Sequence, residues 1–389
     1  MRKLLGLFLL FTLSFKALAG PQLSNQAKIS LLTCSPGDQL YTLYGHSAIR
    51  VNDPVVGFDL VFNYGTFDFD TPNFYLKFGK GDLNYWLNYY SFKRFVASYS
   101  YYQQSVTEQE INLTTREKQR LLDALLENAE EANKYYRYDF FFDNCATRIR
   151  DIILDNVDGD VVYTNQADNG LTFRALLHQY QSHVPWISDG LDIILGLKTD
   201  DLADRSNQMF LPDYMKSHFA NAQINNRGES RPLLLETQTV ISFDKQTDDE
   251  QISPSRVVWF LLIVSLFIGF VEIKKRKKPM VFINRILLTL TGSVGCLIFF
   301  LWFLSRHSVT GDNFNMLWAM PFNLFLAFLP AWFFKSKAFK VYLAFSIISV
   351  ALAVIFFWSI PQYLPPVVLP LSLLILSRFI IWWYLLVKK

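Results

Sequence analysis

The hydrophobic positions divide the chain into two parts with different patterns. The C-terminal third contains five apolar stretches, at about 257–273, 284–304, 315–334, 341–360 and 367–386. Each is close to the roughly 20 residues that an α-helix needs to cross a bilayer. We therefore predict an all-α transmembrane domain of five helices over residues 257–389.

Basic residues between these stretches orient the predicted helices. They form three clusters, at 274–278, at 335–340 and at Lys388-Lys389. Five crossings place all three clusters on one side of the membrane, which the positive-inside rule makes the cytoplasmic side. Residues 20–255 then lie on the opposite side.

The first 19 residues are typical of a secretory signal peptide. Arg2 and Lys3 give a positive start, residues 4–15 are apolar, and Ala17-Leu18-Ala19 is a cleavage site of the A-x-A type. The alternative is an uncleaved N-terminal anchor. The signal peptide requires the topology that the basic clusters indicate. We expect a multi-pass protein of the bacterial inner membrane with a periplasmic domain.

Two runs that read as β-strands, 43–51 and 58–67, flank the turn signal Asn52-Asp53-Pro54 and predict an antiparallel hairpin. The register that we expect pairs opposite charges and apolar residues on one face: Arg50 with Asp59, Ala48 with Val61, and His46 with Asn63. An Asn63 amide beside His46 would hold the imidazole in one tautomer. A slip of one residue would turn Asn63 to the other face.

Helical signals follow the predicted strands. A capping box from Thr114 to Glu117 opens a helix that reaches about Asn133, with leucines along one face. Residues 236–256 are polar and are predicted to be a linker. Together with the strands, these elements predict an α+β periplasmic domain over residues 20–235.

Residues 72–112 are rich in Phe, Tyr and Trp. These side chains fit the core and sheet surface of the domain. They also fit a lipid-facing rim, because Tyr and Trp suit the bilayer interface. We favour the first interpretation.

Composition limits the classes of partner. Hydrophobic residues make up 51% of the chain, and the formal net charge is +3. The basic clusters are explained by membrane topology, so we expect no nucleic-acid partner. No cluster of residues has the spacing of metal ligands, and we expect neither a metal nor a cofactor.

Cys145 and His46 are the candidate catalytic residues. Cys145 follows Asp143-Asn144, good N-cap residues, so it lies in the first turn of a helix, where the dipole and free N–H groups favour a thiolate. His46, on a predicted strand, can carry its proton, with Asn63 as the third member of the set. Cys145 is otherwise a small buried residue at a helix start, or forms a disulfide with Cys34. Cys296 lies inside a predicted span.

Two further polar residues belong to the predicted outer side of the membrane domain. His307 lies in the short loop between the second and third predicted spans, and Asn315 follows it closely. We expect both to bind substrate by lining a lipid entry.

Four segments of the exported part resemble the DUF4105 family, whose members are described as having the Lnb N-terminal periplasmic domain. They are residues 31–37, 44–51, 62–67 and 142–145. The segment from His307 to Pro321 is similar to the membrane portion of the same group, so the resemblance covers the whole chain. This sequence departs from the acyltransferase of that group in the residues that follow Cys145.

The resemblance implies a fold and an activity. The fold is papain-like and NlpC/P60-like, with the permuted order in which His46 precedes Cys145. The activity is that of an Lnb-type lipoprotein N-acyltransferase. Such an enzyme moves an acyl chain from a phospholipid, through a cysteine thioester, to the α-amine of a lipoprotein's N-terminal cysteine.

Two other functions use the same residues differently. An NlpC/P60-like cysteine peptidase or amidase would apply the Cys145–His46 pair to cell-wall peptides, although such a hydrolase does not need five membrane spans. A non-enzymatic membrane scaffold would instead have Cys145 bonded to Cys34.

Overall fold

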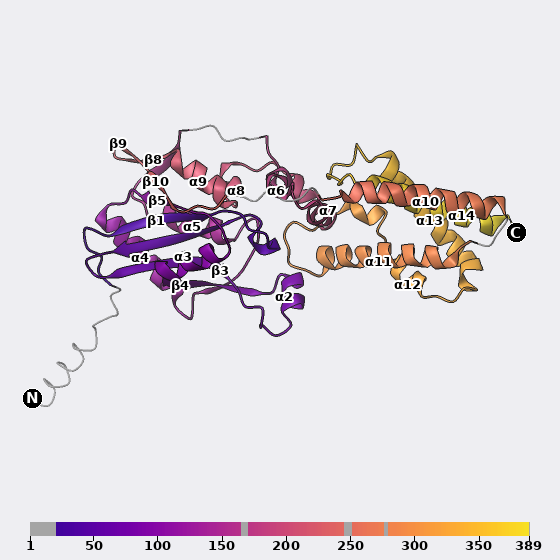
Figure 1. The fold of residues 1–389 in the computed structure, drawn as a ribbon, viewed down its shortest axis with the longest axis horizontal. Coiled ribbons are helices and arrows are strands. Elements are labelled where there is room, and N and C mark those ends of the chain that lie inside the picture. The colour runs from indigo at the N-terminus through magenta and orange to yellow at the C-terminus, as the bar shows by residue number, and fades with distance from the viewer. Residues whose placement is uncertain (1–20, 165–169, 245–250, 276–278, 389) are drawn as a thin grey trace, which may run out of the picture. The chain divides into compact units, whose positions relative to one another are not determined.

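The computed structural model describes residues 21–164, 170–244, 251–275 and 279–388, and the predicted signal peptide lies outside them. The chain forms two compact units, which are described separately (Figure 1). The sheet unit comprises Met1–Asp68, Asn84–Ala167 and Arg205–Asp244. The membrane unit comprises Phe69–Leu83, Asp168–Asp204 and Lys245–Lys389. The periplasmic segment predicted as one domain over residues 20–235 therefore contributes to both units.

The sheet unit is built on a seven-stranded antiparallel sheet with the strand order β10-β5-β1-β2-β3-β4-β6 (Figure 1). Its strands are β1 (Lys28–Cys34), β2 (His46–Asp53), β3 (Phe58–Thr66), β4 (Asn84–Ser91), β5 (Val106–Ile111), β6 (Tyr135–Arg137) and β10 (Leu234–Ile241). A second sheet contains β7 (Asp160–Tyr163), β8 (Ala222–Asn226) and β9 (Glu229–Pro232). Residues 236–241 of the predicted linker are therefore part of a paired strand, and that part of the prediction is wrong.

Helices cover both faces of the large sheet. They are α3 (Phe92–Tyr101), α4 (Thr115–Ala129), α5 (Cys145–Asp155), α8 (Arg205–Gln208) and α9 (Pro212–Ala220), with the short 3-10 helix η1 (Leu40–Thr42). Phe95 of α3 packs on Leu32, Ala48 and Val61, which share one face because side chains alternate along a strand. Tyr64, on the other face, accepts a hydrogen bond from Asn128 of α4. The unit is thus a mixed α/β domain with a core on each side of the sheet.

The capping box at Thr114 is confirmed, and the helix that it opens ends at Ala129. The Thr114 hydroxyl accepts from Glu117 N, and the Glu117 carboxylate accepts from Thr114 N at 2.6 Å. The same carboxylate also pairs with Arg231, which precedes β10 in the sheet unit.

The predicted register of the β2–β3 hairpin is wrong by two residues. Arg50 pairs with Val61, and Asp59 pairs with Asn52. The cause is the turn, where the buried Asp53 carboxylate accepts hydrogen bonds from the backbone of Val55 and of Val56 and holds a four-residue loop. A shift of two keeps every side chain on its expected face.

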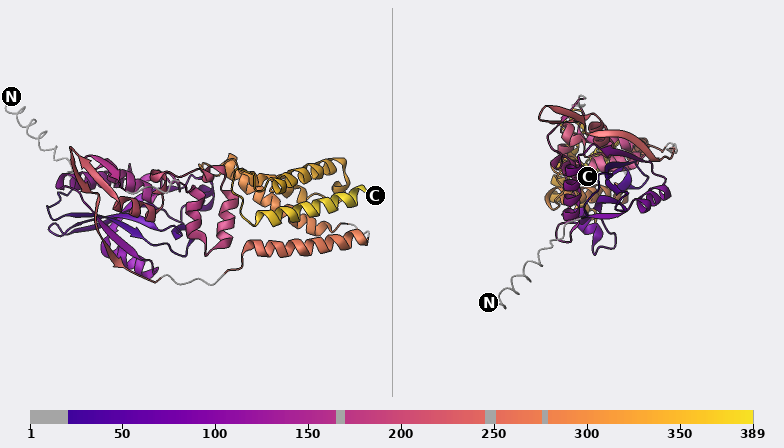
Figure 2. Two further views of the ribbon diagram at one scale, coloured as in Figure 1. Left: turned by 90° about the horizontal axis from the view of Figure 1, so that it is seen from above. Right: turned by 90° about the vertical axis from the view of Figure 1, so that its left-hand side faces the viewer.

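The membrane unit contains four helices long and apolar enough to cross a bilayer within the residues described (Figure 1, Figure 2). They are α10 (Pro254–Lys274), α11 (Val281–Phe303), α13 (Lys337–Ile355) and α14 (Val368–Val387). The third predicted span, 315–334, is instead divided into η3 (Phe314–Leu317), α12 (Phe322–Ala327) and η4 (Phe333–Lys335). Pro321 and Pro330 break the helical hydrogen-bond ladder there.

The broken segment lies along α11 in the opposite direction. Asn323 Nδ2 donates to Thr291 Oγ1 at 3.0 Å, and Arg285 Nη2 donates to Leu329 O at 2.6 Å. Two glycines of α11 permit this approach, because a Cβ at Gly292 would overlap Leu324 and one at Gly295 would overlap Ala319. Irregular backbone at membrane depth is tolerated where protein surrounds it. The number of crossings stays a prediction.

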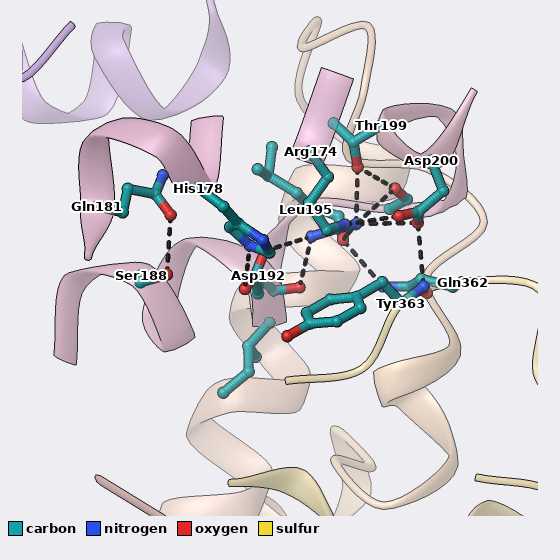
Figure 3. Close-up of polar contacts among 12 residues, drawn as sticks. Arg174, His178, Gln181, Ser188, Asp192, Leu195, Thr199, Asp200, Gln362 and Tyr363 are labelled. Atoms are coloured by element: carbon teal, nitrogen blue, oxygen red, sulfur yellow. Dashed lines mark hydrogen bonds and ion pairs between the residues drawn. The ribbon is translucent and has the colours of Figure 1, made fainter. Parts of the chain in front are cut away.

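Residues 170–204 form a cap at the loops that join the membrane helices. The cap contains α6 (Phe173–Gln181), α7 (Pro185–Ile194) and η2 (Leu197–Asp200). Figure 3 shows Arg174 of α6 between the Asp192 and Asp200 carboxylates, at 2.7 and 2.8 Å. Gln362, in the loop after α13, donates to Leu195 O at 2.9 Å. The buried ionic cluster thus holds the cap together, and the hydrogen bond from Gln362, with a second from Tyr363 N to Asp200, joins the cap to the loop after α13.

A second buried ion pair joins three membrane helices. Arg378 of α14 contacts the Glu272 carboxylate at 2.8 Å and the Asn284 side-chain oxygen at 2.9 Å. Arg378 is 1% exposed, Glu272 3% and Asn284 0%. Charged groups inside a bundle are costly unless they are paired in this way.

Replacing only Arg378 should therefore destabilise the membrane unit strongly. We expect Arg378→Met to cost about 3–5 kcal/mol, because it leaves the Glu272 carboxylate buried without its partner. Combining it with Glu272→Leu should recover most of that loss. Thermal unfolding of the purified protein in detergent would measure both, and equal melting temperatures for the single and double variants would contradict this account.

Candidate active site

The start of α5 is fixed by Asn144, which is 2% exposed. Its Oδ1 accepts hydrogen bonds from Ala146 N at 2.8 Å and from Thr147 N at 2.9 Å. Its Nδ2 donates to Phe140 O and Phe210 O, both at 2.8 Å. Since both ends of the amide are bonded, Asn144 joins the helix start to the segment before it and to the turn before α9. The first residue of α5, Cys145, is held at a helix N-terminus as predicted.

Cys145 packs closely against β3 and is 7% exposed. Gly65 of β3 lies beside it, in a backbone conformation that residues other than glycine rarely adopt. It adopts φ +86°, and a Cβ there would lie 3.7 Å from the Cys145 Cβ and 3.4 Å from the Tyr138 ring. The backbone N–H groups of Ser47 and Ala146 donate hydrogen bonds to the sulfur. The thiol is therefore surrounded by donors.

His46, the first residue of β2, donates the side-chain hydrogen bond to Cys145. Its Nε2 lies 3.4 Å from Asn63 Oδ1. Asn63 is 5% exposed, and its Nδ2 donates to Val61 O at 3.2 Å, which turns Oδ1 toward the imidazole. Because Nε2 faces Asn63, Nδ1 is the nitrogen left to exchange a proton with the sulfur.

The structure thus brings Cys145, His46 and Asn63 together. Asn63 reaches His46 from a diagonal position on β3, because Ile49 pairs with Phe62 and not with Leu60. Diagonal neighbours lie within reach of long side chains. The contact expected from the sequence is present, although the register that predicted it was wrong.

The Cys145 thiol and the His46 imidazole each shift the pKa of the other toward its charged form. Burial alone would raise the pKa of the Cys145 thiol, but the charge and hydrogen bond of His46 outweigh burial and lower that pKa below its usual value. Burial likewise opposes the imidazolium, yet Cys145 and Asn63 raise the pKa of His46. Each group therefore stabilises the charged form of the other, and their two titrations are linked.

Cys34 differs from Cys145 although the two thiols share the sheet unit. It lies opposite His46 on β1, is 0% exposed and packs under α3 beside Tyr99. Burial raises the pKa of this thiol well above its usual range. All three cysteines of the chain are free thiols in the structure. Cys34 therefore has the environment of an unreactive core residue.

The sequence analysis missed Tyr136, a residue of β6. It is 9% exposed, and its hydroxyl is buried without a hydrogen-bond partner. A Cβ on Gly65 would lie 3.9 Å from that hydroxyl. Arg148, one turn after Cys145, lies 3.5 Å above the Tyr136 ring and pairs with Asp143. Burial, and then the nearby Cys145 charge, raise the pKa of Tyr136. Tyr136 lies on a three-residue strand among other aromatic residues, so no sequence pattern singled it out.

The two predicted lipid-entry residues belong to the membrane unit. His307 Nε2 lies 3.0 Å from Phe78 O. Asn315 is 0% exposed, its Oδ1 accepts from Trp318 and its Nδ2 donates to Ile193 O at 3.1 Å. These contacts favour structural roles, and substrate binding by either residue stays a prediction. No group of metal-ligating side chains is present in the described parts of the chain.

The linked titration predicts the pH dependence of thiol reactivity. Alkylation of Cys145 by iodoacetamide should begin below the usual pKa of a cysteine, because the thiolate exists at that pH. His46→Asn removes the positive charge, so burial dominates and the rate profile should move to higher pH. Peptide mass spectrometry would separate Cys145 from Cys34. Identical profiles in the two proteins would contradict the ion pair.

Two protein-family models match this chain, one over its N-terminal part and one over its C-terminal part. The model of the Lnb N-terminal periplasmic domain matches residues 22–179, and that of the Lnb transmembrane domain matches residues 245–389. Among curated proteins and solved structures, none matches the chain. The two family matches cover most of the sequence and confirm the resemblance seen in its motifs. The chain belongs to the Lnb family and is a membrane protein with a periplasmic part.

Proposed function

We propose that this protein is a lipoprotein N-acyltransferase of the bacterial inner membrane that uses Cys145 as its nucleophile. The observation that carries the proposal is the Cys145–His46–Asn63 set at the start of α5, in a chain that also contains a transmembrane domain. A cysteine at a helix start, against a sheet that supplies the His and Asn, also supports a papain-like fold with His46 before Cys145.

In the first half-reaction, the Cys145 thiolate attacks an ester carbonyl of a phospholipid. A bond forms between the sulfur and the carbonyl carbon, and the bond to the glycerol oxygen breaks. His46 gives its proton to that oxygen, and a lyso-phospholipid leaves. The acyl chain remains on Cys145 as a thioester.

In the second half-reaction, the neutral α-amine of a lipid-modified N-terminal cysteine on a lipoprotein attacks the thioester. His46 takes a proton from the attacking nitrogen, and an amide forms. The sulfur leaves as the thiolate, which restores the resting ion pair. Two successive substrates on one thiol predict ping-pong kinetics.

Both half-reactions pass through a tetrahedral intermediate whose oxygen carries a negative charge. The backbone N–H groups of Ser47 and Ala146 already point to the sulfur, and the helix N-terminus favours an anion nearby. The unpaired Tyr136 hydroxyl is a further donor for this oxygen. A buried hydroxyl without a hydrogen-bond partner destabilises the fold, and donation to this oxygen would give it a partner.

The activity predicts a direct chemical test. Cells that lack their own N-acyltransferase should produce N-acylated lipoproteins when they express this chain. They should not do so with Cys145→Ala, because no thioester can form. Mass spectrometry of lipoprotein N-termini measures the product, with immunoblotting to equalise protein levels.

Cys34→Ala is the matched control, since it removes the other thiol of the sheet unit and should leave acylation intact. If the wild-type chain and Cys145→Ala gave the same lipoprotein masses, the acyl-transfer proposal would fail. Release of cell-wall peptides by the purified protein would then favour the peptidase alternative.

Tyr136→Phe should separate oxyanion stabilisation from nucleophile formation. We expect turnover to fall by about 10²-fold, as for the loss of one oxyanion donor. The pH profile of Cys145 alkylation should stay unchanged, because the phenol does not create the thiolate. A parallel loss of alkylation would show instead that Tyr136 only supports the local fold.

A further inference from the structure

The segment 69–83 presents apolar side chains that the proposed chemistry does not use. It contains the short helix α2 (Phe74–Lys80) and belongs to the membrane unit. Four of its large side chains are at least half exposed: Phe69 at 56%, Tyr75 at 83%, Leu76 at 54% and Phe78 at 50%. We call these four residues the α2 patch. Phe74 is 9% exposed, and its ring lies against the rings of Phe69, Tyr75 and Phe78.

The α2 patch is fixed at the end of a membrane-spanning helix. α11 ends at Phe303, and the chain that follows it binds α2 directly (Figure 1). Arg306 N donates to Lys80 O at 2.8 Å, and the Arg306 guanidinium pairs with Asp82 at 3.1 Å. His307 Nε2 contacts Phe78 O at 3.0 Å. The position of α2 relative to α11 is thus set by several polar contacts.

This end of α11 lies at the outer side of the bilayer. Its other end, at Val281, follows the basic cluster 274–278, which the positive-inside rule places in the cytoplasm. A helix of 23 residues is long enough to cross to the opposite side. α2 therefore lies at the level of the outer headgroups.

Exposed apolar side chains are present at the end of α11 as well as on α2. Near its end, α11 exposes Phe299 at 42% and Phe303 at 54%, and Leu304 beyond it is 61% exposed. In a spanning helix such side chains are expected to face lipid. The α2 patch adds exposed apolar side chains beyond the residue where the helix stops, with the aromatic composition of an interfacial belt.

The charges of α2 fit a lipid surface. Lys77 and Lys80 lie on the helix, and residues 74–80 contain no acidic side chain, while the neighbouring Arg306 is paired with Asp82. Lysine and arginine next to exposed aromatics bind lipid phosphates while the rings enter the acyl boundary.

We propose that the α2 patch is an interfacial lipid-binding segment of the membrane unit, which inserts into the outer leaflet at the boundary between headgroups and acyl chains. α2 connects β3 to β4, and β3 carries Gly65 beside Cys145. The lipid-bound segment is therefore continuous in sequence with a strand of the candidate active site. The proposed insertion does not depend on the acyl-transfer chemistry, and its test is separate.

The test is photo-cross-linking of the full-length protein in vesicles of phosphatidylethanolamine and phosphatidylglycerol that contain an alkyne-tagged lipid. Benzoylphenylalanine replaces Tyr75 in one protein, Phe303 in a second and Tyr101 in a third. Tyr101, a tyrosine of α3 in the sheet unit, is 81% exposed and matches Tyr75 in type and exposure. Phe303 reports the lipid contact of the spanning helix.

We expect lipid adducts at position 75 to approach those at position 303 and to exceed those at position 101 severalfold. Adding Lys77→Glu and Lys80→Glu should lower the yield at position 75 and leave that at position 303 unchanged, which also reports that the bundle is folded. Equal yields at positions 75 and 101 would overturn the proposal. Cross-links from position 75 to a second copy of the chain, in place of lipid, would also overturn it.

Discussion

The candidate active site depends on the ion pair between a buried thiolate and a buried imidazolium. Neither charge is stable in this position alone, because burial raises the pKa of Cys145 and lowers that of His46. Each therefore requires the other, together with the donors that surround the sulfur. The local fold supplies this geometry through the Asn144 cap, the glycine at position 65 and the Asn63 amide behind His46. Cys34 lacks those partners, and the same burial raises the pKa of its thiol.

A related constraint governs the membrane unit, where unpaired polar groups are costly. Glu272 and Arg378 neutralise each other within the bundle, and Arg174 is enclosed by two carboxylates in the cap. The broken third segment satisfies the same requirement by packing along α11. In both units these buried charges therefore lie against groups of opposite charge.

The acyl-transfer proposal and the α2 patch address different needs of one enzyme. In the proposal, the sheet unit would supply a nucleophile and a proton carrier, which would serve acyl transfer and hydrolysis equally well. The membrane unit would supply access to lipid, which would distinguish a transferase that uses a phospholipid from a hydrolase of soluble peptides. An interfacial α2 would hold the connection between β3 and β4 at the surface where the acyl donor resides.

Much of this molecule was evident in the sequence, because some signals are local. The N-cap at Asn144, the capping box at Thr114 and four apolar helices depend on residues within one or a few turns, and the structure has all of them. The motifs also sufficed to identify the family. Features that depend on contacts between residues far apart in the chain were harder to predict from the sequence. The hairpin register followed from the Asp53 turn, and the third apolar stretch broke at its prolines against glycines of α11.

The sequence by itself indicated which residues are candidates for the chemistry and which segments are apolar enough to lie in a membrane, since short motifs and local runs of apolar residues encode both. Only the tertiary structure decided that Asn63 reaches His46 from a diagonal position, that Tyr136 has a buried and unpaired hydroxyl, and that α2 belongs with the membrane helices. Each of these depends on contacts between segments far apart in the chain, whose geometry no local pattern specifies.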